Sequence, residues 1–188
     1  LSNAQPGWYD ATGGKITQSG GIITADRLIA RARGDVALDS RNRIAALGWT
    51  ASTAGNVSIT NANALELTDA VTANGEVALD AASINQSGGF IQAANLRARA
   101  SGGLSPDAVN QIASAGTVAL DAGADIAFLN DGGFTVGMID TPGAATLTAL
   151  NGSIEQAAAT RIGAGRLMVS AANGAITLDA ANLVDAVG

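Results

Sequence analysis

A four-residue motif recurs at a fixed interval in this sequence, and its spacing constrains the fold more than any other feature. Three copies follow one another at equal intervals: Val36-Ala37-Leu38-Asp39, Val77-Ala78-Leu79-Asp80 and Val118-Ala119-Leu120-Asp121. Looser copies begin at Val57 and Ile176, and the first of these divides its interval into two nearly equal units. Self-similarity at such a period indicates a solenoid of stacked repeats.

The motif also predicts the structure of each unit. Alternate side chains of a strand face opposite ways, so the valine and the leucine point to one side and the aspartate to the other. A unit of about 20 residues is too small to bury its apolar side alone, but it can do so by stacking on copies of itself. We therefore predict an all-β fold, a right-handed parallel β-helix with coils of about 20 residues. Its expected interior comprises Val36, Leu38, Val57, Ile59, Val77, Leu79, Val118, Leu120, Ile176 and Leu178.

A second, longer repeat is superimposed on the first. The run Ile-Thr-Gln-Ser-Gly-Gly at 16–21 returns with one change at 84–89, and a partial copy, Ile154-Glu155-Gln156, follows at a similar distance. The same order of elements continues with an Ala-x-x-Leu that ends at Leu28, Leu96 and Leu167. Three coils of about 20.5 residues amount to about 62, so the two repeats cannot be in phase and some coils must be longer. We expect segment 102–107 to be a degraded strand that has become a loop.

These elements together resemble the haemagglutinin-type repeats of filamentous haemagglutinin-like exoproteins, which Gram-negative bacteria export by two-partner secretion. The resemblance covers roughly residues 13–182 and rests on the Ile-x-Gln-Ser-Gly-Gly-x-Ile run, Ala-x-x-Leu, Asn-x-Ile-Ala and the Gly-x-Val-x-Leu strands. It implies a structural shaft that holds the adhesive regions of a secreted or cell-surface adhesin away from the cell. It also implies an outer-membrane two-partner secretion transporter as a partner, and a host-cell glycan or protein as a receptor.

Composition agrees with a single solenoid. Of the 188 residues, 47% are apolar but only 3% are aromatic and 14% charged, as stacked coils with small side chains require. We expect residues 5–188 to form one solenoid and residues 1–4 to be the remnant of an expression tag. The apolar segment 182–188 resembles the start of another coil, which predicts a fragment of a longer array with an edge prone to edge-to-edge self-association.

Several partners and reactions are disfavoured by what the sequence contains. The sequence contains no apolar run of about 18 residues, so we do not predict membrane insertion. The net charge of -6 disfavours nucleic acid as a partner. Cysteine and histidine are both absent, which excludes disulfides, thiolate metal sites and catalysis that depends on imidazole.

One enzymatic alternative remains open, a β-helical polysaccharide lyase or glycosidase. In that function Asp39 and Asp80, about 9.6 Å apart at about 4.8 Å per coil, would act as a catalytic pair. The same aspartate recurs at Asp121 and Asp179, however, which favours a turn-capping role over a unique pair. We therefore predict that the chain is not an enzyme and has no catalytic residue and no cofactor.

Metal ligands and surface contacts complete the expectations. The turns at 121–125 and 130–133 offer oxygen atoms but lack the carboxylate spacing of a calcium loop, so no metal site is predicted. Trp8 and Tyr9 are expected to cover one end of the solenoid, and the few aromatic residues are not expected to cluster. The predicted surface contacts are Trp49 and two pairs of outward-facing basic residues, Arg31 and Arg33, and Arg97 and Arg99.

Overall fold

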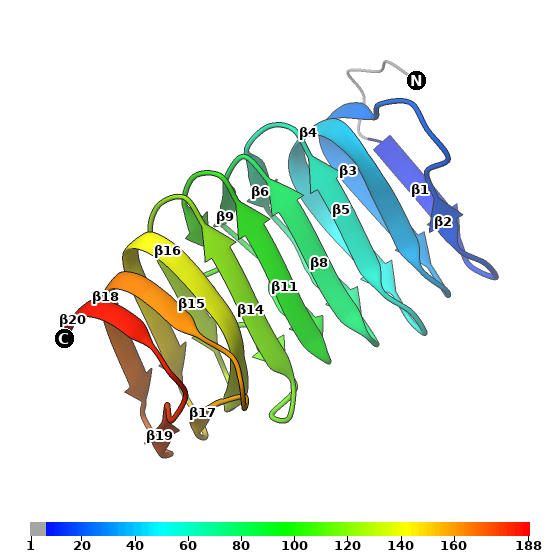
Figure 1. Cartoon of the computed structure of the whole chain (residues 1–188). Coiled ribbons are helices and arrows are strands. Elements are labelled where there is room, and N and C mark those ends of the chain that lie inside the picture. The colour runs from blue at the N-terminus through cyan, green and yellow to red at the C-terminus, as the bar shows by residue number, and fades with distance from the viewer. Residues whose placement is uncertain (1–6) are drawn as a thin grey trace.

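The computed structural model describes residues 7–188, and the predicted tag remnant at residues 1–4 lies outside the described residues. Parallel strands stack into a β-solenoid of about nine turns of roughly 20 residues, and no helix occurs in the described part of the chain (Figure 1). The predicted all-β parallel β-helix is confirmed. The described residues accordingly contain no helix that is long and apolar enough to cross a membrane.

The strands are short except where one runs around a corner of the coil. Their bounds are β1 Gly7–Ala11, β2 Ile16–Thr17, β3 Thr24–Ala32, β4 Val36–Ser52, β5 Val57–Asn61, β6 Leu65–Leu67, β7 Val71–Ala73, β8 Glu76–Ala81, β9 Ile84–Gln86, β10 Ile91–Ala93, β11 Asn95–Ala100, β12 Leu104–Ser105, β13 Gln111–Ile112, β14 Thr117–Ala122, β15 Ile126–Asn130, β16 Phe134–Ala149, β17 Ile154–Gln156, β18 Ile162–Ala171, β19 Ile176–Thr177 and β20 Leu183–Val187.

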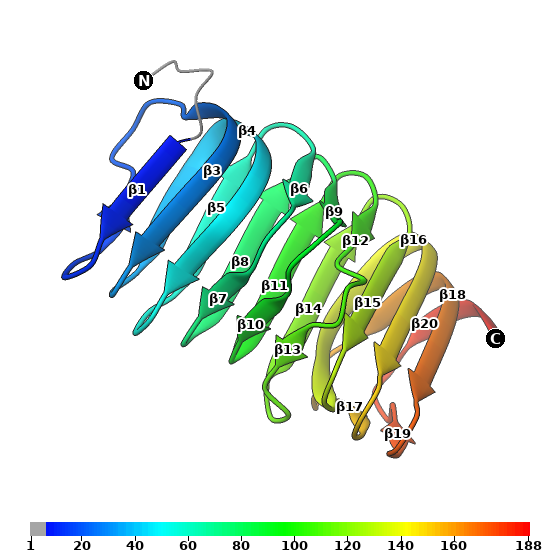
Figure 2. The same cartoon turned by 180° about the vertical axis from the view of Figure 1, so that it is seen from behind.

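Three stacks of parallel strands surround the interior. Stack A contains β2, the start of β4, β5, β8, β11, β14 and the start of β16. Stack B contains β6, β9, β12, β15 and the ends of β16 and β18. Stack C contains β1, the ends of β3 and β4, β7, β10 and β13, several of which are seen in Figure 2.

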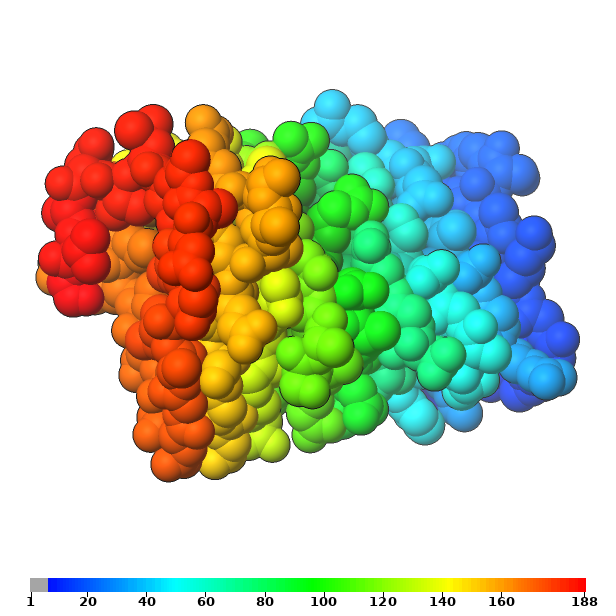
Figure 3. Space-filling model, turned by 60° about the horizontal axis from the view of Figure 1, so that its bottom comes forward, coloured from blue at the N-terminus to red at the C-terminus, as the bar shows by residue number. Residues whose placement is uncertain are grey.

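The register of stack A confirms the short period. Leu38 pairs with Ile59 and Ile59 pairs with Leu79, so the interval from Leu38 to Leu79 spans two coils. Coil length nevertheless varies, because the coil that joins Ile139 to its partner Ile162 is longer than the one that joins Leu79 to Ala98. Each coil contacts the coils before and after it, and the molecule is therefore a row of slabs in sequence order (Figure 3).

A continuous apolar interior runs along the axis. Of the ten predicted interior residues, eight are buried: Val36, Leu38, Val57, Ile59, Val77, Leu79, Val118 and Leu120. Burial of each such side chain stabilises the fold by about 1.5 to 3 kcal/mol. Leu178 is partly buried and packs against this interior, whereas the prediction is wrong for Ile176, which is 46% exposed. Strand β19 pairs with β17 on one side, and no described strand covers its other side.

Three smaller expectations also need correction. Phe128 and Phe134 do cluster, since their rings meet edge to face with 5.2 Å between centroids. Segment 102–107 is not a loop throughout, because Leu104 is buried in the stack between Ile84 and Ile126. Trp8 does not cover an end of the solenoid; it points outward from β1 and is 63% exposed.

Buried asparagines fix the corners of the coils. Asn61 Oδ1 accepts a hydrogen bond of 2.8 Å from the Ile44 N–H of the preceding coil, and Asn130 Oδ1 accepts one of the same length from Ile112 N–H. Asn42 and Asn110, which are buried, and Asn182, which is exposed, bind a backbone N–H of the preceding coil in the same way. A buried N–H without a partner costs free energy, so these side chains stabilise corners that strand pairing leaves unsatisfied.

The long repeat arises from a pairing that we call the Gln–Asn bracket, a glutamine bonded to an asparagine of the next coil. The three brackets are Gln18–Asn42, Gln86–Asn110 and Gln156–Asn182, with nitrogen–oxygen distances of 2.9, 3.1 and 2.8 Å. The residue three positions after each glutamine has a positive φ: 73° at Gly21, 63° at Gly89 and 60° at Ala159. The Gly-Gly of the first two copies therefore supplies a left-handed turn.

Successive brackets lie in different stacks, as the mismatch of the two periods requires. Ile16 lies beside Val36 in stack A, Ile84 lies beside Leu65 in stack B, and Gln156 returns to stack A beside Val136. The brackets bind the N–H groups of isoleucines at nearly equal intervals along the chain, at positions 23, 91 and 162. Each long repeat thus advances by about three and a half coils of roughly 20 residues.

Candidate functional site

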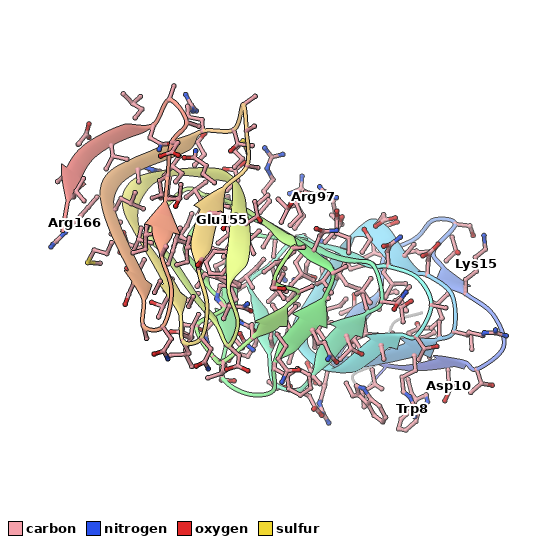
Figure 4. The ribbon with its side chains drawn as sticks, turned by 90° about the horizontal axis from the view of Figure 1, so that it is seen from below. Trp8, Asp10, Lys15, Arg97, Glu155 and Arg166 are labelled. Atoms are coloured by element: carbon pink, nitrogen blue, oxygen red, sulfur yellow. The ribbon has the colours of Figure 1, made fainter. Side chains whose placement is uncertain are left out.

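The predicted contact residues fall on two different faces of the solenoid. Trp49, Arg31 and Arg33 line one small hollow beside stack C. Arg97 and Arg99 lie on β11 in stack A. Figure 4 shows Arg97 projecting from the side of the molecule opposite to Trp8 and Asp10. The structure therefore brings together three of the five predicted residues and separates the other two.

The first face is organised around a stacked guanidinium. Arg31 places its Cζ 4.2 Å from the centroid of the Trp49 ring, a cation–π contact. The pairing of β1 with β3 puts Asp10 directly opposite Arg31, and Asp10 Oδ2 lies 3.9 Å from Arg31 Nη1. The carboxylate and the indole thus hold the guanidinium from two sides, and this fixes the orientation of Trp49.

Strand alternation brings a second tryptophan to the same face. In β1, Tyr9 packs against the core, which turns its neighbour Trp8 outward. Trp8 is paired with Ile29 of the next coil, and Trp49 lies at the same side one coil further on. We call Trp8, Asp10, Arg31, Arg33 and Trp49 the tryptophan surface. The sequence-based prediction did not place Trp8 on this face, because two adjacent aromatic residues give no sign of which one points inward.

Gly48, next to Trp49, leaves room for the Arg27 side chain to pass close to the backbone. A Cβ atom at Gly48 would lie 2.7 Å from Arg27 Nε, so any other residue at this position would displace that side chain. Arg27 runs past Gly48 and places its Nη2 3.4 Å from Asp69 Oδ2. Arg31 thus covers one face of the Trp49 ring, and Trp49 remains 45% exposed.

The second face carries a row of charges in register along stack A. Arg99 lies between Asp80 and Asp121 of the neighbouring coils, and its Nη2 is 2.8 Å from Asp121 Oδ2. The hydrogen bond to Asp121 raises the pKa of Arg99, with further contributions from the negative charges of Asp121 and Asp80. Arg161 makes a looser pair with Asp140, at 3.5 Å. Because these residues are largely exposed, water screens the attraction within each pair.

Of the two aspartates proposed as a catalytic pair, Asp39 already has a side-chain partner. Asp39 Oδ1 accepts a short hydrogen bond from Ser58 Oγ of the next coil. Leu38 and Leu79 are two coils apart in stack A, and Asp39 and Asp80, which directly follow them, are separated by the coil of β5, as predicted. This spacing alone does not make a catalytic pair, since retaining or inverting hydrolysis needs one carboxylate placed to act as an acid.

Each of the two turns considered for calcium has a side-chain oxygen that is bonded to the backbone. Asp125 Oδ1 accepts a hydrogen bond of 2.8 Å from the Ala144 N–H. Asn130 is buried, with its Oδ1 bonded to Ile112 N–H. Within residues 7–188, no three carboxylate side chains converge in a way that could hold a metal ion.

Comparison with known families gives one match. A family model described as repeats of unknown function (DUF5649) matches residues 124–187, which run from the turn before β15 into β20. No curated protein and no solved structure matched the chain. The match supports the repeat character of this part of the solenoid.

Proposed function

We propose that the chain is a structural shaft segment of a large adhesin, secreted or displayed on the surface of a Gram-negative bacterium. The observation that carries the proposal is the unbroken column of buried residues, in which each coil is held only by its neighbours. Such a solenoid gains length by adding coils without changing its cross-section. The ordered Gln-Ser-Gly-Gly and Asn-x-Ile-Ala elements add the resemblance to filamentous haemagglutinin-like repeats and, with it, export through a two-partner secretion transporter.

A test of the location needs only an antibody raised against the purified chain. We expect the antibody to label intact cells of the source bacterium, and external protease to abolish this labelling without lysis. Loss of the outer-membrane transporter encoded with the gene is expected to abolish labelling as well. Labelling that requires permeabilised cells would contradict the proposal.

We also infer that the chain is not a polysaccharide-cleaving enzyme, the alternative function considered for paired aspartates. Two observations support this: Asp39 is bonded to Ser58, and Arg99 lies in register between Asp80 and Asp121 and is paired with Asp121. Incubation of the purified chain with polygalacturonate and with neutral glucans is expected to release no reducing ends and no unsaturated products. Release of either product that is lost in Asp80→Asn would overturn the inference.

A further inference from the structure

We propose that the tryptophan surface binds a carboxylated saccharide, such as a chain that contains uronic acid residues. This inference goes beyond the shaft role and does not depend on it, because it rests on the side chains of one face and not on the stacking of coils. The argument rests on three properties of the surface: exposed aromatic area, a ring fixed in advance, and a local excess of positive charge.

The exposed aromatic area is concentrated at this one place. The chain has two tryptophans, and both are exposed on this face, Trp8 at 63% and Trp49 at 45%. They lie two coils apart, about 9.6 Å along the axis, with the partly buried Ile29 between them. Indole rings offer flat apolar faces with a polar N–H, which suits the C–H faces and hydroxyl groups of sugar rings. Two rings at this spacing can contact different sugars of one extended chain.

Trp49 is held in place before any ligand arrives. Its ring lies under Arg31, and Arg31 is held in turn by Asp10 of the preceding coil. A side chain that already has a contact on one face loses less conformational entropy on binding than a free one, so more of the contact energy appears as affinity. The Arg31 guanidinium has five N–H donors and only one ion pair, at 3.9 Å, so donors remain for a ligand oxygen.

The charge of the surface selects an acidic ligand. Arg33 is exposed in the same hollow, and it has no carboxylate partner among residues 7–188. With Arg31 and Asp10 balancing each other, Arg33 leaves this surface positive in a protein whose net charge is -6. A guanidinium binds a carboxylate through two parallel hydrogen bonds. Thr12 and Thr53 line the same hollow and add hydroxyl groups that can bond to those of a sugar.

The two tryptophans also provide the measurement. Because they are the only two in the chain and both belong to this surface, their fluorescence reports on it directly. We expect titration of the whole chain with tetragalacturonate to change the tryptophan emission in a saturable way. The methyl-esterified tetragalacturonate, which has the same rings without the charge, is expected to bind at least about tenfold more weakly.

Matched variants locate the binding. Arg33→Gln and Trp49→Ala are each expected to weaken tetragalacturonate binding about tenfold or more, measured by calorimetry, with the melting temperature as a control for folding. Arg97→Gln on the opposite side serves as the control and is expected to leave the affinity unchanged. A failure of these experiments would not affect the surface-labelling result, which tests the shaft role separately.

Four outcomes would overturn the proposal. These are no saturable change up to about 10 mM of the acid, equal affinity for the ester, an equal loss in Arg97→Gln and Arg33→Gln, or a fluorescence change that follows protein concentration without sugar. The last of these would identify the surface as a contact between two copies of the chain.

Discussion

At the scale of single residues, the position three after each bracket glutamine has the same left-handed backbone but not the same residue. The first two brackets place glycine where the backbone is left-handed, and the third places Ala159 there with a φ of 60°. A side chain with a Cβ atom is strained in this region, at a cost of roughly 1 to 2 kcal/mol. The third copy keeps the glutamine and the asparagine but lacks the glycine, so only its Ile-x-Gln remains recognisable in the sequence.

Ala159→Gly is therefore expected to stabilise the chain by about 1 kcal/mol, because it removes the strain of a Cβ atom at positive φ. Urea unfolding compared with the parent chain measures the gain. Ala158→Gly is the matched control, since Ala158 has no positive φ and the substitution there only increases the entropy of the unfolded chain. Equal effects of the two substitutions would show that Ala159 is not strained.

Asn61→Ala is expected to destabilise the chain by roughly 2 to 4 kcal/mol, because both the N–H and the C=O of Ile44 lose a buried partner. Asn63→Ala, two positions away and exposed, is expected to change little. Thermal unfolding of the two variants side by side tests the corner role. Similar melting temperatures for both would contradict it.

At the scale of elements, the sequence predicted the positions of the strands built on the short motif and left open the stack to which each strand belongs. Valine and leucine in Gly-x-Val-x-Leu identify the interior side of a strand, because the alternation of side chains requires only local information. The stack to which each strand belongs depends on breaks in register, such as those between Leu28 and Ala30 and between Thr141 and Ala144. Glycine lies at both breaks, as Gly48 and as Gly143, but with 24 glycines in the sequence its presence alone does not mark them. The tryptophan surface was found only in part for the same reason, since it depends on which coils lie side by side.

Leu79→Ala in β8 is expected to cost about 2 to 5 kcal/mol, as the truncation of a buried side chain leaves a cavity. The urea midpoint measures the loss. Gln92→Ala in β10, on an outward-facing position, is the control and is expected to stay within about 0.5 kcal/mol of the parent. A midpoint for Leu79→Ala that equals the control would show that the interior register is wrong.

At the scale of the whole molecule, the fold behaves as a stack of interchangeable slabs. Val57 and Val77 occupy equivalent positions in neighbouring coils, and the residues between them complete one turn. No bracket crosses this coil, because the first ends at Asn42 and the second begins at Gln86. The stability of such a molecule is approximately a sum of coils and of interfaces between them.

Deletion of residues 57–76, one whole coil, is therefore expected to leave a folded and shorter solenoid in which Val36 pairs with Val77. Deletion of residues 57–66, half a coil, is expected to prevent folding, because every later strand would meet the wrong stack. Far-ultraviolet circular dichroism and small-angle scattering distinguish the two products. A folded half-coil variant, or an unfolded whole-coil variant, would contradict the slab description.

Because successive brackets alternate between two stacks, the number of long units that a duplication adds decides which way the new copies face. Duplication of one long unit inserts about three and a half coils, so the new copy starts about half a turn around the axis. A bracket that lay in stack A then has its copy in stack B. Duplication of two units inserts about seven coils and restores the original facing. An array extended in pairs would therefore present the same outward surface at intervals of about 34 Å, at about 4.8 Å per coil.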